Sequence, residues 1–158
     1  MENQLVVFSL ANEHYAVGIG AVDSIIKIQP ITYVPRAPAF VEGVTNLRGK
    51  VLPVVDLRKR FDLPVTPESK ETRIVVTELN GSAVGMIVDS VSEVLRVPAE
   101  AIEPPSPIVT TVDSVFVTGI AKMDERLIIL LDLDKVLSPE EKTELKTMPA
   151  AADAGDEQ

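Results

Sequence analysis

One segment of the chain places a single arginine in a turn between two stretches of extended chain. Residues 43–58 read Gly-Val-Thr-Asn-Leu-Arg-Gly-Lys-Val-Leu-Pro-Val-Val-Asp-Leu-Arg. Asn46 and Gly49 flank Arg48, and both residue types tolerate the positive φ of a tight turn. Such a turn would hold the Arg48 guanidinium outward at a fixed angle, and a guanidinium pairs bidentately with carboxylates. The segment therefore predicts a recognition turn. The other four basic residues up to Arg60 are interpreted as a solvated face.

Two aspartates that follow apolar runs are the candidates for covalent or metal chemistry. Asp56 follows residues 51–55, and Asp132 follows residues 127–131. Asp132 and Asp134 form a D-x-D pattern like that of the haloacid dehalogenase phosphatases, although the remaining chain is too short to supply the Thr, Lys and acidic residues of such a site. The favoured interpretation is that Asp56 and Asp132 each N-cap a short helical turn. A small Asp-dependent phosphatase or phosphoacceptor protein that uses Asp132 and Asp134 remains the alternative.

The other residue types exclude most catalytic and cofactor sites. The sequence has no Cys and one His, His14, which we place in a polar turn with Glu13. Thiolate metal sites, disulfides and Cys nucleophiles are therefore absent, and one imidazole cannot build a metal site. No glycine-rich phosphate loop and no set of acid, base and oxyanion donor can be assembled. We expect no enzyme activity, no metal and no cofactor.

Charge and hydropathy restrict the partners. The net charge of -9 repels phosphate backbones, so nucleic acid is not an expected partner. The first four residues lack the basic region of a signal peptide, and the longest apolar run, residues 127–131, is too short to span a bilayer. We expect a cytoplasmic protein with no direct membrane insertion.

Composition and internal similarity predict a mainly all-β fold. The chain is 46% hydrophobic and 4% aromatic, so its core is built from Val, Ile and Leu, and β-branched residues favour strands. Three segments recur in the same order and indicate a duplication: residues 16–19 as 83–86, 22–28 as 91–97, and 54–61 as 130–137. Asp56 recurs in this pattern and Arg48 does not. We therefore expect two similar small β-barrels packed together.

The barrels and the C-terminal region have expected boundaries. One barrel covers roughly residues 15–66 and the other roughly 70–137, and the N-terminal strand, residues 5–10, could pair with either. Residues 21–28 fit a short helix or a strand with a bulge. The sequence from Ser138 has a capping box and predicts a short helix over 138–147. Residues 148–158 are acidic and Ala-rich and predict a disordered tail.

Several aliphatic residues could form either core or an interaction surface. They are Val22, Ile25, Ile26, Val94 and Val97. Each one alone is best interpreted as core, but an exposed aliphatic patch would mark a site of protein–protein contact. The spacing does not separate the two interpretations.

The chain resembles the CheW family of chemotaxis coupling proteins. The resemblance is carried by residues 40–57, and further by 7–10 with Tyr15, 38–40, 84–91 and 118–121. It implies one CheW-like domain over residues 1–137, built from two SH3-like five-stranded β-barrels around a shared hydrophobic core. It also implies a non-catalytic adaptor that couples methyl-accepting chemoreceptors to the histidine kinase CheA in two-component signalling. Such an adaptor is cytoplasmic and is recruited to membrane receptor arrays.

The same resemblance implies which residues contact partners. Those that would bind the hairpin tip of the receptor, in a groove between the barrels, are Arg48, Val22, Ser24, Gly85 and Val94. Those that would bind the CheW-like regulatory domain of the kinase are Gly43, Ile25 and Ile26. The family usually has Glu where this chain has Ser24. The charge partner expected near Arg48 is therefore missing or displaced to Asp23.

A third hypothesis is a β-barrel that binds a small ligand. It predicts an enclosed apolar cavity, whereas an adaptor of the CheW type predicts barrels filled by their own side chains.

Overall fold

The computed structural model describes residues 2–35, 41–61, 63–64, 66–79, 82–104, 117–123, 126–132 and 135. The predicted C-terminal helix over 138–147 and the predicted tail over 148–158 lie outside these residues. Within them the regular structure is almost entirely strand, which confirms the mainly all-β fold. The strands are β1 (Glu2–Leu10), β2 (Glu13–Gly18), β3 (Val22–Lys27), β4 (Val41–Leu47), β5 (Lys50–Asp56), β6 (Arg73–Leu79), β7 (Ser82–Val88), β8 (Ser90–Pro98), β9 (Ile102–Glu103), β10 (Val117–Met123) and β11 (Arg126–Leu131). The helical turns are η1 (Ile19–Ala21), α1 (Leu57–Arg60) and η2 (Ala99–Ala101).

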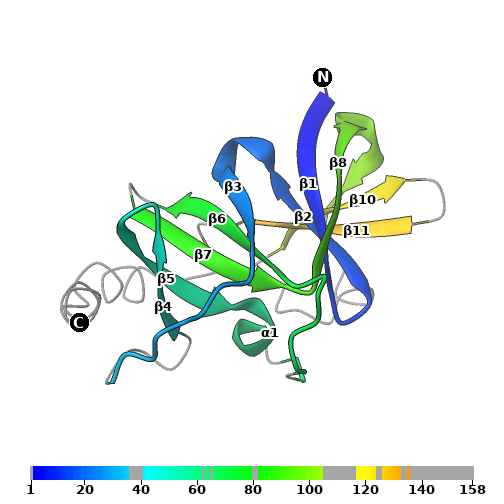
Figure 1. Ribbon diagram of the computed structural model, residues 1–158. Helices are drawn as coiled ribbons and strands as arrows, with labels where there is room; N and C mark the ends of the chain where they lie inside the picture. Colours follow the sequence, from blue (N-terminus) through cyan, green and yellow to red (C-terminus); the bar gives the residue numbers. More distant parts are fainter. Residues whose placement is uncertain are drawn as a thin grey trace.

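The strands form two sheets of matching order, which Figure 1 shows beside each other. One sheet has the order β3-β6-β7-β5-β4, and we call it the first barrel. The other has the order β8-β1-β2-β11-β10-β9, and we call it the second barrel. In the first, a bridge between Thr32 and Val44 returns the chain after β3 to the edge of β4. In the second, the two-residue strand β9 pairs with β10 at the equivalent place. Each barrel thus has five long strands and a short closing segment, as in SH3-like barrels.

The two barrels do not follow the boundary that the sequence suggested. The hairpin β1–β2 pairs with β8 and β11 in the second barrel, whereas the hairpin β6–β7 pairs with β3 and β5 in the first. Residues 73–88 therefore belong with the first barrel and not with a barrel over 70–137. Each half of the chain donates its opening hairpin to the other half. The two hairpins carry similar alternating apolar faces, so the pattern alone does not specify in which barrel each one pairs.

The pairing registers identify which residues are equivalent in the two barrels. Leu10 pairs with Glu13 at the tip of one hairpin and Leu79 with Ser82 at the tip of the other. Ala16 is therefore equivalent to Gly85, and the sequence match of Ala16 to Ala83 is out of register by two positions. The other two matches hold: Ile25 opposite Val75 corresponds to Val94 opposite Val6, and Val54 corresponds to Leu130.

Among the described residues, three groups of buried side chains fill the fold. A shared core between the two sheets includes Phe8, Tyr15, Val55 and Met86 among its members. Leu52, Ile74 and Val76 fill the first barrel, and a group that includes Val7, Ala16 and Ile128 fills the second. The barrel interiors are therefore packed by their own side chains, as expected of an adaptor and not of a ligand-binding barrel. In the part of the chain that the structure describes, no helix is long and apolar enough to cross a membrane.

Strand β3 resolves the ambiguity over residues 21–28. It is a strand with a bulge at Asp23, because Val22 pairs with Thr77 while Ser24 pairs with Val76. The bulge inserts Asp23 as an extra residue in β3 with no partner of its own in β6. The side chains on either side of Asp23 therefore no longer alternate regularly between the two faces of the sheet. Val22 and Ile25 consequently lie on the face toward the shared core. Ser24 and Ile26 lie on the face toward the interior of the first barrel.

Candidate partner-binding surface

The hairpin between β4 and β5 holds Arg48 in the predicted tight turn. Leu47 pairs with Lys50, which leaves Arg48 and Gly49 as a two-residue loop with φ values of 53° and 80°. Positive φ at both loop residues is the geometry of a type I′ hairpin turn. The Asn46 side chain accepts a hydrogen bond from the Gly49 amide at 3.0 Å, which supports the turn from within. The side chain of Arg48 is exposed on this rigid support, as the sequence predicted.

The structure brings Arg48 against the exposed edge of β3. Its Nη2 donates a hydrogen bond to Ser24 Oγ at 3.4 Å, and Ser24 Oγ donates to Asp23 Oδ2 at 3.3 Å. This contact spans the seam of the first barrel, where β3 and the β4–β5 hairpin meet without pairing. A long hydrogen bond to a neutral hydroxyl leaves most of the guanidinium available to another acceptor.

The second barrel has an ionic contact across the equivalent seam. Glu93 on β8 is equivalent to Ser24, and Arg126, the first residue of β11, is equivalent to Lys50. Arg126 Nη1 lies 2.8 Å from Glu93 Oε2. The position equivalent to Arg48 is 124, which is an Asp in the sequence. The two seams therefore differ in charge: the second is closed by a carboxylate from β8, whereas β3 offers a hydroxyl.

Two of the predicted aliphatic contact residues occupy equivalent, exposed positions. Ile25 on β3 is 40% exposed and Val94 on β8 is 50% exposed. Each lies opposite a residue of the shared core, Val75 and Val6 respectively, so each extends the apolar face of its sheet past the core to the outer strand. Val22 is half-buried against the same core. Val97, by contrast, is fully buried in the second barrel.

The remaining predicted contact residues, Gly43, Gly85 and Ile26, are packed against other parts of the first barrel. A Cβ at Gly43 would lie 2.2 Å from the carbonyl oxygen of Thr32, and its φ is 152°. A Cβ at Gly85 would lie 2.7 Å from Ile74 Cγ2. Ile26 is half-buried against the interior of the first barrel. Gly43 and Gly85 thus permit close approach of neighbouring strands, and their effect on a partner would act through the shape of the barrel.

The structure also contains an ion pair that the sequence analysis missed. Arg58 was interpreted as solvated, yet its side chain is only 14% exposed and forms two hydrogen bonds with Asp89, from Nε at 2.8 Å and from Nη2 at 2.6 Å. This contact holds the pKa of the Asp89 carboxyl below its usual value, against the opposing effect of burial. The available signal was that Asp89, like Asp56, ends an apolar run.

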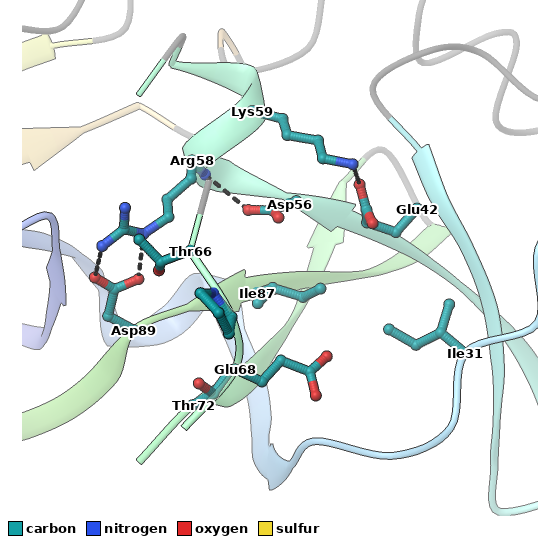
Figure 2. Close-up of a pocket in the computed structure, with 11 residues that line it drawn as sticks. Ile31, Glu42, Asp56, Arg58, Lys59, Thr66, Glu68, Thr72, Ile87 and Asp89 are labelled. Atoms are coloured by element: carbon teal, nitrogen blue, oxygen red, sulfur yellow. Dashed lines mark hydrogen bonds and ion pairs between the residues drawn. The ribbon is translucent and has the colours of Figure 1, made fainter. Parts of the chain in front are cut away.

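Figure 2 shows this pair at one side of a surface pocket of about 320 Å³ and the pair of Lys59 with Glu42 at the other. Asp56 lies between them. Burial raises the pKa of Asp56, despite the hydrogen bond that its side chain accepts from the Arg58 amide at 2.9 Å. Asp56 is the N-cap of α1, so the structural interpretation of this residue is confirmed. The cations in the pocket are engaged by carboxylates of the same chain.

The structure gives Asp132 and His14 backbone roles. The carbonyl of Asp132 accepts a hydrogen bond from the Lys135 amide at 2.9 Å, while Asp134 lies outside the described residues. His14 was predicted in a turn but lies in β2, opposite Ser9, because the turn is only two residues long, Ala11 and Asn12. Among the described residues no group of three or more His, Asp or Glu side chains could hold a metal ion.

Comparison with known proteins gives a consistent result. The model of the CheW-like domain family matches residues 4–141. The chain is 36% identical to the chemotaxis protein CheW of Klebsiella aerogenes, over 87% of this chain and 83% of that protein. It is 37% identical to the chemotaxis protein CheW of Bacillus subtilis, over 87% and 88%. The crystal structure of the scaffolding protein TtCheW from Thermoanaerobacter tengcongensis matches with a TM-score of 0.81 and 45% identity, covering 89% of this chain and 91% of that one.

Two paired sheets around a shared core, in the arrangement of a solved scaffolding protein at 45% identity, define a scaffold of the adaptor class. The chain belongs to the CheW-like domain family. It is a non-catalytic chemotaxis adaptor, which sets aside the phosphatase alternative that rested on Asp132 and Asp134.

Proposed function

We propose that this adaptor couples methyl-accepting chemoreceptors to the histidine kinase CheA by binding both at once. The observation that carries the proposal is the Arg48 turn beside β3, where an exposed guanidinium reaches Ser24 on the same strand whose Val22 and Ile25 lie on the apolar face toward the shared core. A helical hairpin could bury the aliphatic side chains and place a carboxylate on Arg48. The identity of the relatives supports the chemotaxis setting.

The receptor contact would use Arg48 with Val22, Ser24 and Val94, and Gly85 would keep the first barrel in shape. The kinase contact would use Ile25 together with the closing segment of the first barrel, which Gly43 and Ile26 support from within. The adaptor would act in the cytoplasm and reach the membrane through the receptor arrays. Contacts of this kind often have micromolar affinity, about -8 kcal/mol, so assembly would depend on many linked contacts.

Arg48→Glu tests the proposal directly. In a pull-down with a purified receptor signalling domain and CheA, the wild-type chain should form a ternary complex and raise kinase activity. Arg48→Glu should lose receptor binding and kinase activation while its unfolding curve stays close to that of the wild type. Lys50→Ala is the matched control, because Lys50 is an exposed cation on the same hairpin. An Arg48→Glu variant that still forms the complex and activates the kinase would exclude the proposal.

A further inference from the structure

The chain crosses between the two barrels at two equivalent places. After β2 it leaves the second barrel through η1 and enters β3 of the first. After β7 it leaves the first barrel through Asp89 and enters β8 of the second. The registers make Gly20 in the first crossover equivalent to Asp89 in the other. The connections are therefore equivalent in topology, but they differ in the residue at their centre.

The crossover at Asp89 is connected to two other segments directly and to a third through Arg58. Its carboxylate accepts two hydrogen bonds from Arg58 and one from the Ala11 amide at 2.9 Å, and its own amide donates to the Ser9 carbonyl at 3.0 Å. Arg58 Nη1 also donates to the Pro64 carbonyl at 2.5 Å. Asp89 and Arg58 thereby join the β7–β8 crossover to the tip of the β1–β2 hairpin, to α1 at the end of β5, and to the segment that follows α1. Ser9 and Ala11 belong to the β1–β2 hairpin of the second barrel, whereas Arg58 lies in α1, which begins directly after β5 of the first.

The crossover at Gly20 has no side chain with which to make such a junction. A Cβ at either Gly18 or Gly20 would meet no atom within 4 Å, so no neighbouring segment packs against these two positions, and the contact that η1 makes with the shared core comes from Ala21. Glycine also leaves the backbone more freedom than any other residue. The two barrels also meet at the shared core, whose apolar packing lacks the directional hydrogen bonds of a bidentate ion pair.

We propose that Arg58 and Asp89 are positioning residues that fix the orientation of one barrel relative to the other. The bidentate ion pair is directional and restrains the β7–β8 crossover. Without it, the two barrels could rotate relative to each other about the crossover at Gly20. The functional consequence of this fixed orientation rests on the proposed coupling role. A fixed angle between the barrels keeps Ile25 of the first barrel and Val94 of the second in the relative position that simultaneous binding of receptor and kinase requires.

The orientation can be measured without any partner. The chain has no Cys, so Lys27→Cys and Arg96→Cys give two unique spin-label sites. Both residues are exposed and occupy equivalent positions on β3 and β8. By pulsed electron paramagnetic resonance, the doubly labelled protein should give one narrow distance distribution. Adding Arg58→Lys, which keeps the charge but loses the fork geometry, should broaden or shift it, and Asp89→Asn should do the same.

Glu93→Gln is the matched control, since it removes an ion pair that lies within a single barrel. Its distance distribution should stay as narrow as that of the parent. If Asp89→Asn unfolds, the conservative Arg58→Lys variant alone tests whether the ion pair fixes the distance between the barrels. Distributions that are unchanged in Arg58→Lys, or broadened equally in Glu93→Gln, would overturn the proposal.

A second measurement separates this inference from the proposed function. Arg58→Lys should bind the receptor domain alone and CheA alone within about twofold of the wild type, yet raise kinase activity less in the ternary mixture. If the wild-type chain bound neither partner, the coupling role would be wrong while the distance result would still stand. If Arg58→Lys activated the kinase fully despite a broadened distribution, the link between orientation and coupling would be refuted.

Discussion

Glu93 occupies on β8 the position that Ser24 occupies on β3, and the two residues close their seams differently. Glu93 receives the Arg126 guanidinium at 2.8 Å, whereas Ser24 receives that of Arg48 at 3.4 Å. The second barrel thus shows which group suits this position, a carboxylate facing a guanidinium. In the first barrel the carboxylate is replaced by a hydroxyl, and the arginine has correspondingly more freedom to meet a partner.

Ser24→Glu should create an ion pair with Arg48 across the seam of the first barrel. We expect it to raise the free energy of unfolding by about 0.2–1 kcal/mol, as for other exposed pairs. The gain should vanish in an Arg48→Ala background and in 1 M salt, where screening acts over about 3 Å. Urea unfolding of the four members of this double-mutant cycle measures it, with the uncharged Ser24→Gln as control. A gain that survives without Arg48 would disprove the pairing.

The equivalent glycines Gly43 and Gly119 should both resist substitution. A Cβ would lie 2.2 Å from the Thr32 carbonyl oxygen in the first case and 2.9 Å from that of Glu103 in the second. Because Gly43 also has a positive φ, we expect Gly43→Ala to cost about 2–4 kcal/mol and Gly119→Ala about 1–3 kcal/mol of unfolding free energy. Gly18→Ala, with open space and a φ of -61°, should leave stability unchanged or raise it. Equal costs at Gly18 and Gly43 would contradict the argument.

The N-cap role of Asp56 predicts a difference between two substitutions. Asp56→Ala removes the acceptor for the Arg58 amide and should cost about 1 kcal/mol. Asp56→Asn keeps an acceptor of the same shape, so it should cost nothing at neutral pH. Thermal unfolding of both variants measures the difference. If both lost the same stability, the side chain would matter for its charge and not as a cap.

Local features of this fold were predictable from sequence because short-range chemistry determines them. Asn46 and Gly49 predicted the turn at Arg48, and an aspartate after a strand predicted the cap at Asp56. Both depend on residues a few positions apart. The β-branched composition likewise predicted strands and two barrels, since alternating apolar residues fit a pleated sheet with one buried face.

The exchange of hairpins and the ion pair of Arg58 were not predictable in the same way. The hairpins β1–β2 and β6–β7 present similar apolar faces, so binary patterning fits either barrel equally well. The partner of Arg58 is Asp89, which lies in the other half of the chain. The pairing of Arg58 could be recognised only after the strand order was known. From the sequence alone, Lys50, Lys59 and Arg60 in the same segment fit a solvated face as well as Arg58 does.

The exposed pair Ile25 and Val94 should matter for partners and not for folding. Each is at least 40% exposed, so Ile25→Ser and Val94→Ser should change the free energy of unfolding by no more than about 0.5 kcal/mol. If these residues contact receptor or kinase, each substitution should weaken one complex about tenfold, equivalent to about 1.4 kcal/mol. Leu127→Ser is the matched control, since Leu127 is 46% exposed at the β10–β11 hairpin. If Leu127→Ser weakened binding as much as Ile25→Ser and Val94→Ser, these two positions would have no specific role in partner binding.

The two carboxylates around Arg58 should respond to pH in opposite directions. Hydrogen bonding from Arg58 lowers the pKa of Asp89 below its usual 3.8, so its ionised form stabilises the fold at pH values above 3.8. That contribution is lost as the pH falls through the lowered pKa. Burial raises the pKa of Asp56 above 3.8, so its ionised form costs stability at neutral pH. This cost is relieved as the pH falls through the raised pKa.

Urea unfolding of Asp89→Asn and Asp56→Asn between pH 7 and pH 3 tests these opposite signs. Asp89→Asn should be less stable than the wild type at pH 7, by about 1–2 kcal/mol for a partly exposed charged hydrogen bond, and the deficit should shrink below pH 3.8. Asp56→Asn should be as stable as the wild type or more stable at pH 7, and any advantage should shrink as the pH falls towards 3.8. Parallel profiles for the two variants would show that burial, and not the Arg58 guanidinium, controls both carboxylates.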